Sequence, residues 1–267
     1  MKTAVKSEAD RNTLQTCLND LVKWSEEWGM EFNVKKCKIL HVERTNPRYG
    51  YTMLGVPLKA VEEEKDIGVW MHSSLKPSHQ CAEAAKTGNL VLGKLLRAFH
   101  YRDKRVFLNL YKQQVRPHLE FSSSTWSAHQ QSEISMLEKV QIRAVNSISG
   151  LKGATYKEKL KELNLLSLED RRNRADMIQV YKILHKLDDV DYQIWFTTMG
   201  ETAQRFTRLS EYPQNLASTK SKTDIRNNFF SQRVVPKWNT LPVNIKDKPT
   251  LKGFKSELDK YLMNLNN

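Results

Sequence analysis

The chain has 267 residues, 39% of them hydrophobic, so it can bury a core and form roughly one or two domains, which argues against disorder throughout. It contains no run of about 18 uncharged apolar residues and no apolar signal-peptide core at its N-terminus. We therefore expect an intracellular protein, in the cytoplasm or the nucleus, without a membrane partner. The formal net charge of +13 favours a polyanionic partner.

An amphipathic helix is predicted near the N-terminus. Ser7 and Asp10 form a capping-box pattern at its start. Gly29 is a credible stop, because glycine readily adopts the left-handed backbone that ends many helices. Between them, apolar residues recur at helical spacing: Leu14, Leu18, Leu21, Val22 and Trp28.

Short strands are predicted next, over residues 38–43, 50–55 and 66–71. Asn46 with Pro47, and Gly55 with Pro57, supply turn signals between them. These strands are expected to form one small antiparallel sheet.

From Ser78 onward the apolar period becomes helical. Helices are predicted over residues 78–100, 103–116, 132–149, 155–163 and 167–187. Capping-box patterns mark the last two, with Thr155 before Glu158 and Ser167 before Asp170. The middle of the chain is therefore predicted to be all-helical.

The C-terminal part begins with a polar stretch, residues 199–222, which is typical of a loop or linker. An aromatic-rich segment follows at residues 229–238, then a turn at Leu241 and Pro242, and a final helix after Pro249 that runs through Leu262. The predicted fold class is α+β, mostly α, with a small antiparallel sheet followed by a helical bundle and a helical tail.

A basic face is predicted on the helices between residues 86 and 116. Its cations interleave with apolar residues at helical periods, so that charge and core can occupy opposite sides of the same helices. Asp103 is their only acidic counterweight; the cations are Lys86, Lys94, Arg97, Arg102, Lys104, Arg105, Lys112 and Arg116. An ordinary solvated surface is the alternative interpretation.

Three further arginines stand at an unusual place. Arg171, Arg172 and Arg174 lie just inside a predicted helix start, where the helix macrodipole disfavours cations. Such a placement indicates a contact, either with phosphate or with carboxylates of a neighbouring helix, and the internal contact is favoured.

No metal site or catalytic group is predicted from spacing. The pair Asp188 and Asp189 is expected at a helix end, and the acidic residues between 62 and 66 are expected in a solvated turn. The seven histidines lack zinc-site spacing, and the three cysteines are odd in number and widely separated. The tryptophans could stack bases but are more often core residues.

The stretch at residues 24–42, WSEEWGMEFNVKKCKILHV, resembles the reverse transcriptases of non-LTR retrotransposons, of the jockey and chicken-repeat type of long interspersed element. In that family a helix with spaced tryptophans leads into F-N-x-x-K-C, at the end of the fourth conserved palm segment. The resemblance continues through EEEKDIGV at 62–69, YRDK at 101–104, LY at 110–111, VRPHLE at 115–120, LEKVQ at 137–141 and NNFFSQRVV at 227–235. Nearly the whole chain is covered.

The resemblance implies a domain plan. Residues 1–76 would be a palm remnant, 77–198 a helical thumb-like domain, 199–224 a polar linker and 225–267 a C-terminal helical tail. In the family, an Asp pair on a strand hairpin before this region holds Mg²⁺. This chain begins after that hairpin, so we expect no catalytic residues, no metal, no cofactor and no polymerisation by the chain alone.

The resemblance implies roles for two sets of residues. Lys36 matches a palm lysine that approaches the triphosphate tail of the nucleotide, with an exposed strand lysine as the alternative. Ile67, Gly68, Val69 and Trp70 match the strand that starts the primer grip, where glycine lets the backbone approach the nascent end. A glycine in a strand can equally mark a bulge.

Three functions follow as expectations. The first is a reverse-transcriptase-derived protein that grips the RNA/DNA template-primer but does not polymerise alone. The second is a non-enzymatic module that binds the backbone of duplex or hybrid regardless of sequence, through Lys94, Arg97, Arg102, Lys104, Arg105, Lys112 and Arg116. The third is a fragment that pairs with the missing polymerase portion or another protein, through an uncovered sheet.

Overall fold

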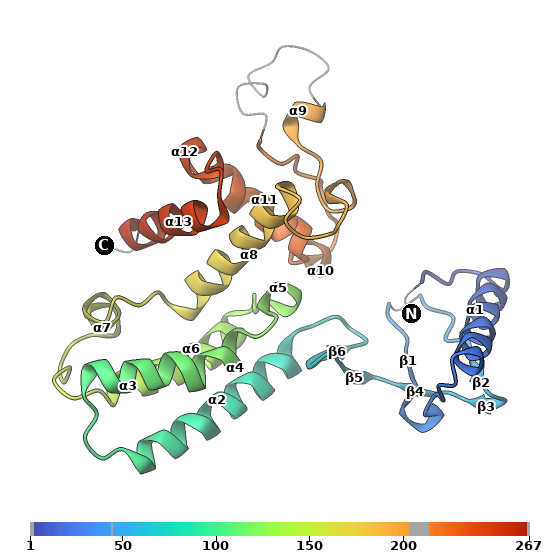
Figure 1. The fold of residues 1–267 in the computed structure, drawn as a ribbon, viewed down its shortest axis with the longest axis horizontal. Coiled ribbons are helices and arrows are strands. Elements are labelled where there is room, and N and C mark those ends of the chain that lie inside the picture. The colour runs from blue at the N-terminus through green and yellow to red at the C-terminus, as the bar shows by residue number, and fades with distance from the viewer. Residues whose placement is uncertain (1–2, 44, 203–213, 266–267) are drawn as a thin grey trace. The chain divides into compact units, whose positions relative to one another are not determined.

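A computed structural model describes residues 3–43, 45–202 and 214–265. The chain divides into two compact units, residues 1–80 and 81–267, which are described separately (Figure 1). The fold class is α+β with helices predominating, as the sequence predicted. No helix in the described ranges is long and apolar enough to cross a membrane.

The first unit combines one long helix with short strands. Its elements are α1 (Glu8–Glu27), the 3-10 turn η1 (Val34–Lys36), β1 (Lys38–Leu40), β2 (Thr52–Met53), β3 (Val56–Pro57), β4 (Lys59–Val61), β5 (Glu63–Asp66) and β6 (Val69–His72). The predicted capping box is present, since the Ser7 hydroxyl accepts from the Asp10 N–H while the Asp10 carboxylate accepts from the Ser7 N–H. Gly29 follows the helix with a φ of +65°. The first helix prediction is therefore confirmed at both ends.

The strands pair differently from the prediction. They form three two-stranded ladders: β1 with β4 in parallel, and β2 with β3 and β5 with β6 antiparallel. Ile67 and Gly68, with φ of +45° and +84°, make a two-residue hairpin turn, so the strand predicted from residue 66 begins at Val69. The acidic residues Glu63 and Glu64, predicted in a solvated turn, lie in β5, because pairing with β6 satisfies their backbone groups. Alternation and turn signals do not specify strand partners, which explains the error.

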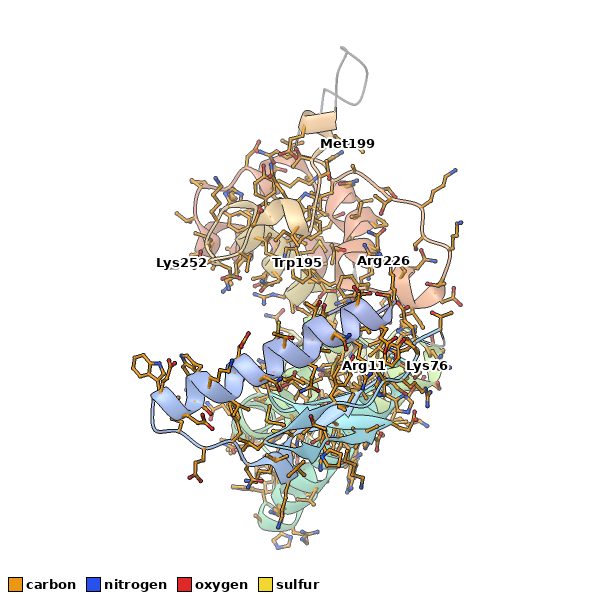
Figure 2. The ribbon with its side chains drawn as sticks, turned by 90° about the vertical axis from the view of Figure 1, so that its right-hand side faces the viewer. Arg11, Lys76, Trp195, Met199, Arg226 and Lys252 are labelled. Atoms are coloured by element: carbon orange, nitrogen blue, oxygen red, sulfur yellow. The ribbon has the colours of Figure 1, made fainter. Side chains whose placement is uncertain are left out.

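Hydrogen bonds and stacking attach α1 to its neighbours. The Gln15 side chain donates to the Thr52 carbonyl at 2.8 Å and accepts from the Thr52 N–H at 2.9 Å. Figure 2 shows Arg11 on the side of α1 that faces the strands, where its guanidinium lies 5.5 Å from the centroid of the Tyr49 ring. Few large apolar side chains of this unit are buried: Tyr51, Met53 and Val69.

The second unit consists of helices and loops, and its first helix starts just before the unit boundary. The elements are α2 (Ser78–Ala98), α3 (Lys104–Leu110), the π-helix η2 (Tyr111–Val115), α4 (Arg116–Glu120), α5 (Ser123–Trp126), α6 (Gln131–Asn146), α7 (Tyr156–Glu162), α8 (Leu168–Leu184), the 3-10 turn η3 (Tyr192–Ile194), α9 (Met199–Thr202), α10 (Asp224–Asn227), α11 (Phe230–Thr240), α12 (Val243–Lys246) and α13 (Leu251–Leu265). The predicted helices of the middle region are found within a few residues of their predicted ends. Thr155 forms its full capping box, and the Ser167 hydroxyl accepts from the Asp170 N–H.

The helix predicted over residues 103–116 changes character part-way. At η2 the hydrogen bonds widen, and the Arg116 N–H donates to the Tyr111 carbonyl five residues earlier. Pro117 follows immediately and has no N–H to offer the chain, so a regular α-helical ladder cannot continue through it. The wider turn of the π-helix accommodates the missing hydrogen bond, and helical structure continues through α4.

Close packing joins α2 to α4. A Cβ placed on Gly88 would lie 2.8 Å from Cδ2 of Leu119, which is shorter than any normal contact. Gly88 therefore lets the two helices approach, at the modest helix-propensity cost that glycine carries.

A polar network lies buried beneath α6. Gln141 is fully buried; it accepts from the Tyr111 hydroxyl at 2.7 Å and donates to the Tyr156 hydroxyl at 2.9 Å and the Leu166 carbonyl at 3.1 Å. The Tyr156 hydroxyl also donates to Glu138, whose pKa is raised by burial. These bonds tie η2, α6 and α7 together.

Replacing Gln141 by leucine is expected to lower the free energy of unfolding by about 2–4 kcal/mol, because the Tyr111 hydroxyl and the Leu166 carbonyl lose their buried partner. Urea denaturation followed by circular dichroism measures the loss. Exposed Gln131 on the same helix is the matched control, and Gln131→Leu should change stability by less than about 0.5 kcal/mol. Equal stability of the two variants would show that the network does not contribute.

The C-terminal helices pack on α8 (Figure 1). Val180 and Tyr181 of α8, Val234 and Trp238 of α11, and Phe254 of α13 belong to one buried cluster. The loop predicted over residues 199–222 contains the short helix α9, and residues 203–213 lie outside the described residues. The final helix, predicted to end at Leu262, runs to Leu265.

Candidate nucleic-acid interface

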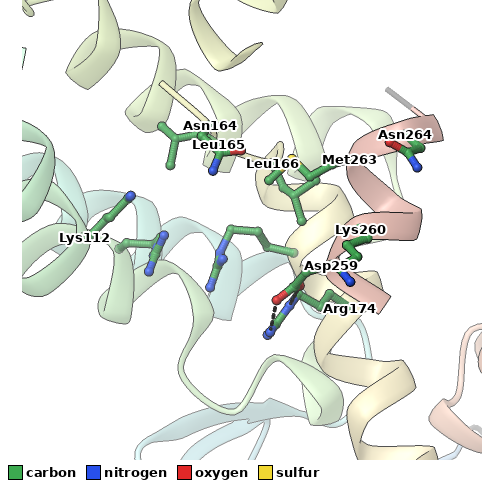
Figure 3. Close-up of a pocket in the computed structure, with 11 residues that line it drawn as sticks. Lys112, Asn164, Leu165, Leu166, Arg174, Asp259, Lys260, Met263 and Asn264 are labelled. Carbon is green, nitrogen blue, oxygen red and sulfur yellow. Dashed lines mark hydrogen bonds and ion pairs between the residues drawn. The ribbon is translucent and has the colours of Figure 1, made fainter. Parts of the chain in front are cut away.

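An open cleft of about 870 Å³ lies between η2, α4, α8 and α13 in the second unit. Figure 3 shows Lys112 facing Arg174 and Asp259 across this space, with Asn164, Leu165, Leu166 and Met263 along another edge. The complete lining is Lys112, Arg116, Asn164, Leu165, Leu166, Arg171, Arg174, Asp259, Lys260, Met263 and Asn264. Cationic side chains from four elements therefore line one cleft.

Lys112 reaches the cleft from the π turn η2, and Arg116 from the start of α4. Among the described residues Lys112 forms no ion pair, and burial lowers its pKa, with nearby Arg116 and Arg171 adding to the effect. The pKa of Arg116 is lowered in the same way, first by burial and then by Arg171. A bound anion would relieve this crowding of like charges.

Two arginines of α8 are held by carboxylates. Arg171 forms a bidentate pair with Glu120 of α4, with Nη2 donating at 2.9 Å, and Arg174 pairs in the same manner with Asp259 of α13, also at 2.9 Å. The predicted internal contact is thus confirmed for both. The carboxylates engage Nε and Nη2, and within the described parts of the chain neither Nη1 group has a hydrogen-bond partner.

Arg172, the third arginine of that group, does not reach the cleft. It is 2% exposed, and its Nη1 and Nη2 atoms have no hydrogen-bond partner in the described structure. Burial lowers its pKa, and the carboxylate of Glu138 opposes that shift most strongly. Arg172 is a buried internal cation, and we assign it no contact with a ligand.

The charge balance of the cleft is positive. Its five cationic side chains are accompanied by three carboxylates within ion-pair distance, Glu120, Asp259 and Glu257, which leaves two positive charges uncompensated. Guanidinium forks and an ammonium group bind phosphate oxygens well. The chemistry available here is anion binding.

The other residues of the predicted basic face lie elsewhere on the unit. Lys94 and Arg97 are exposed on α2, and Arg105 is exposed on α3. Arg102 donates to the Leu96 carbonyl at 3.0 Å, and Lys104 pairs with Glu162 of α7 at 2.5 Å. Of the seven predicted nucleic-acid-binding residues, the structure places Lys112 and Arg116 in the cleft.

The residues assigned by resemblance to the palm lie in the first unit. Lys36 is exposed at the end of η1, so the alternative of a strand lysine was wrong about its backbone. Ile67 and Gly68 form the hairpin turn described above, Val69 is buried, and Trp70 stacks on His79 with ring centroids 4.6 Å apart. Lys65 lies over the same indole at 5.9 Å, so Trp70 already has partners within the unit.

Metal ligands do not converge in the described part of the chain, where no group of three or more His, Cys, Asp or Glu side chains could hold an ion. Asp188 follows the end of α8, as predicted, and accepts from Lys182 at 2.7 Å and Gln179 at 2.8 Å. The three cysteines are free thiols.

Sequence reasoning missed the contribution of α13. Asp259, Lys260, Met263 and Asn264 line the cleft, yet nothing in their local sequence distinguishes them from any other exposed helix face. No protein-family model, no curated protein and no solved structure matches the chain.

Proposed function

We propose that this chain is derived from the reverse transcriptase of a non-LTR retrotransposon and that its helical unit binds the backbone of an RNA/DNA template-primer or duplex. The supporting observation is the convergence of Lys112, Arg116 and Arg171 on one open cleft. The ordered resemblance along the sequence points to the same role. The proposal concerns binding, and it assigns no bond-making step to this chain.

The composition of the cleft favours contact with phosphates over the reading of bases. Phosphate contacts from Lys and Arg carry no sequence information, and each releases condensed counterions, so affinity falls steeply with salt. Binding at this site is therefore expected to be similar for all duplex sequences of equal length.

The test compares two double variants of equal charge. Lys112→Gln with Arg116→Gln removes two cations from the cleft, whereas Arg97→Gln with Arg105→Gln removes two exposed cations outside it. Fluorescence anisotropy with a labelled mixed-sequence RNA/DNA hybrid, measured from 50 to 300 mM salt, gives the affinity and the salt slope. For the cleft variant we expect an affinity loss of about tenfold or more and a reduction of the log-log slope by about two.

The affinity of the control variant for the hybrid should fall by no more than about threefold, because its two substitutions change only the general charge of the protein. Equal losses in the two variants would place the contact on the broader basic face. A wild-type affinity that does not change with salt would contradict backbone binding altogether.

A second candidate, a protein-interaction fragment, is favoured by the first unit. Trp24 and Trp28 have ring centroids 6.2 Å apart, and Trp28 is 69% exposed at the end of α1. Ile67, at the hairpin tip, is 88% exposed. Exposed aromatic and aliphatic side chains of this size are typical of contact surfaces. A chain that binds no polyanion but associates through this unit would favour that function.

A further inference from the structure

The cleft has two chemically different walls. One is cationic and consists of Lys112, Arg116 and Arg171. The other is built from Leu165, Leu166 and Met263 with the carboxamides of Asn164 and Asn264, which are labelled in Figure 3. A phosphate group would contact only the cationic wall and would leave the second wall without a ligand contact. The pairing of an anion site with an apolar wall and carboxamides matches a nucleotide.

The second wall is fixed by local structure. α7 ends at Glu162 with Leu163 as its C-cap, and Asn164 adopts a left-handed φ of +49°, a conformation in which asparagine is favoured. The Leu165 N–H then donates to the Leu160 carbonyl at 2.9 Å, and the side chains of Leu165 and Leu166 are buried. The exposed Asn164 side chain is therefore held on a rigid turn at the edge of the cleft.

Asn264 stands on α13, one turn after Lys260, and Met263 stands one turn after Asp259. This helix is anchored by Phe254 and Leu258, both fully buried. A carboxamide offers one acceptor and two donors, so Asn164 and Asn264 can bond to the exposed edge of any base. The cleft volume of about 870 Å³ falls in the range of small-ligand sites.

We propose that the cleft binds a single unpaired nucleotide, with its phosphate on Lys112, Arg116 and Arg171 and its base against Met263, between the carboxamides of Asn164 and Asn264. This inference rests on the proposed function only for the source of the nucleotide, which is the 5′-phosphorylated end of a strand. A free nucleoside monophosphate carries the same chemistry. All four bases bind similarly, because carboxamides suit each of them.

The experiment measures binding of adenosine 5′-monophosphate and of inorganic phosphate to the full chain by isothermal titration calorimetry. The nucleotide is expected to bind at least about tenfold more tightly than phosphate, because it contacts both walls. A second measurement uses a hybrid duplex with a one-nucleotide 5′-phosphorylated overhang and the same duplex with blunt ends. The overhang is expected to bind about fivefold more tightly, which identifies the strand end as the source.

The decisive variant is Asn164→Gly with Asn264→Ala. Glycine accepts the positive φ of position 164, and alanine suits the exposed helix position 264, so the fold is retained while both carboxamides are removed. Nucleotide binding should fall towards that of phosphate, and the preference for the overhang should disappear, while blunt-duplex binding is unchanged. Circular dichroism verifies the fold.

Equal affinities for adenosine monophosphate and phosphate in the wild-type chain would overturn the inference and leave backbone binding intact. Nucleotide binding without salt-dependent duplex binding would support the nucleotide site and contradict the proposed function. Tight binding of the free nucleotide with no preference for the overhang would reject the strand end as its source.

Discussion

Replacing Trp238 by alanine is expected to lower the free energy of unfolding of the helical unit by about 3–5 kcal/mol, the range for removing a large aromatic side chain from a core. Trp238 is 1% exposed, and its ring lies 6.1 Å from that of Phe254. Its indole N–H donates to the Gln214 carbonyl at 3.0 Å. The variant loses apolar contact between α11 and α13 and also leaves that carbonyl without its partner.

Urea denaturation, followed by circular dichroism at 222 nm as a helix signal, provides the measurement for Trp238→Ala. The matched control is Trp28→Ala, since Trp28 is 69% exposed, and its effect should stay within about 0.5 kcal/mol. A loss below about 1 kcal/mol for Trp238→Ala would mean that the C-terminal helices are not firmly packed on α8. The cleft would then lack a stable α13 wall.

The second large effect is expected at a buried ion pair between α8 and α11. Asp176 is 3% exposed and accepts two hydrogen bonds from Arg233, at 2.9 Å and 3.0 Å. Arg233 also donates to the Ser124 carbonyl at 2.8 Å and the Asn228 carbonyl at 3.0 Å. This guanidinium therefore connects α5, α8 and α11.

Asp176→Ala is expected to lower the free energy of unfolding by about 3–5 kcal/mol, because it leaves the largely buried charge of Arg233, 13% exposed, without its carboxylate. Thermal and urea unfolding measure the loss. Asp188→Ala is the control, since the pair of Asp188 with Lys182 is more exposed and should contribute about 1 kcal/mol or less. If the two substitutions cost the same, the Asp176 pair is solvated in solution, and its burial would have to be reconsidered.

The two stability predictions bear on function through the position of α8. This helix carries Arg171 and Arg174 into the cleft, and the Trp238 cluster and the Asp176 pair both hold it against the C-terminal helices. Substitutions in this core are therefore expected to weaken polyanion binding indirectly. The cleft variants act directly, with the fold unchanged.

Tryptophan illustrates how far composition can guide a prediction. The general preference of tryptophan for cores holds for Trp126 and Trp238, which are buried, and fails for Trp24 and Trp28, which are exposed. Trp24, Trp28 and Trp238 lie in or next to helices with suitable apolar periods, whereas Trp126 is the last residue of the four-residue helix α5. Burial depends on whether another element covers that face, and the sequence of a single helix does not contain this information.

The positions of the strands likewise depend on contacts with other segments, in this case on backbone pairing. The sequence located β1, β2 and β6 near their observed positions, but it missed β3, β4 and also β5, whose residues Glu63–Asp66 are entirely charged. Backbone hydrogen bonds to β6 stabilise that strand whatever its side chains are. Apolar alternation alone could not have found it.

The sequence by itself determined the long helices, the caps at Ser7, Thr155 and Ser167, and the excess of positive charge. The charge follows from composition, and the helices and caps depend on residues three or four positions apart, so local interactions determine them. The tertiary structure decided which cations share a cleft, because Arg171 and Glu120 are 51 residues apart and Arg174 and Asp259 are 85 apart. Contacts over such separations follow from how whole helices pack, and no short segment of the chain encodes them.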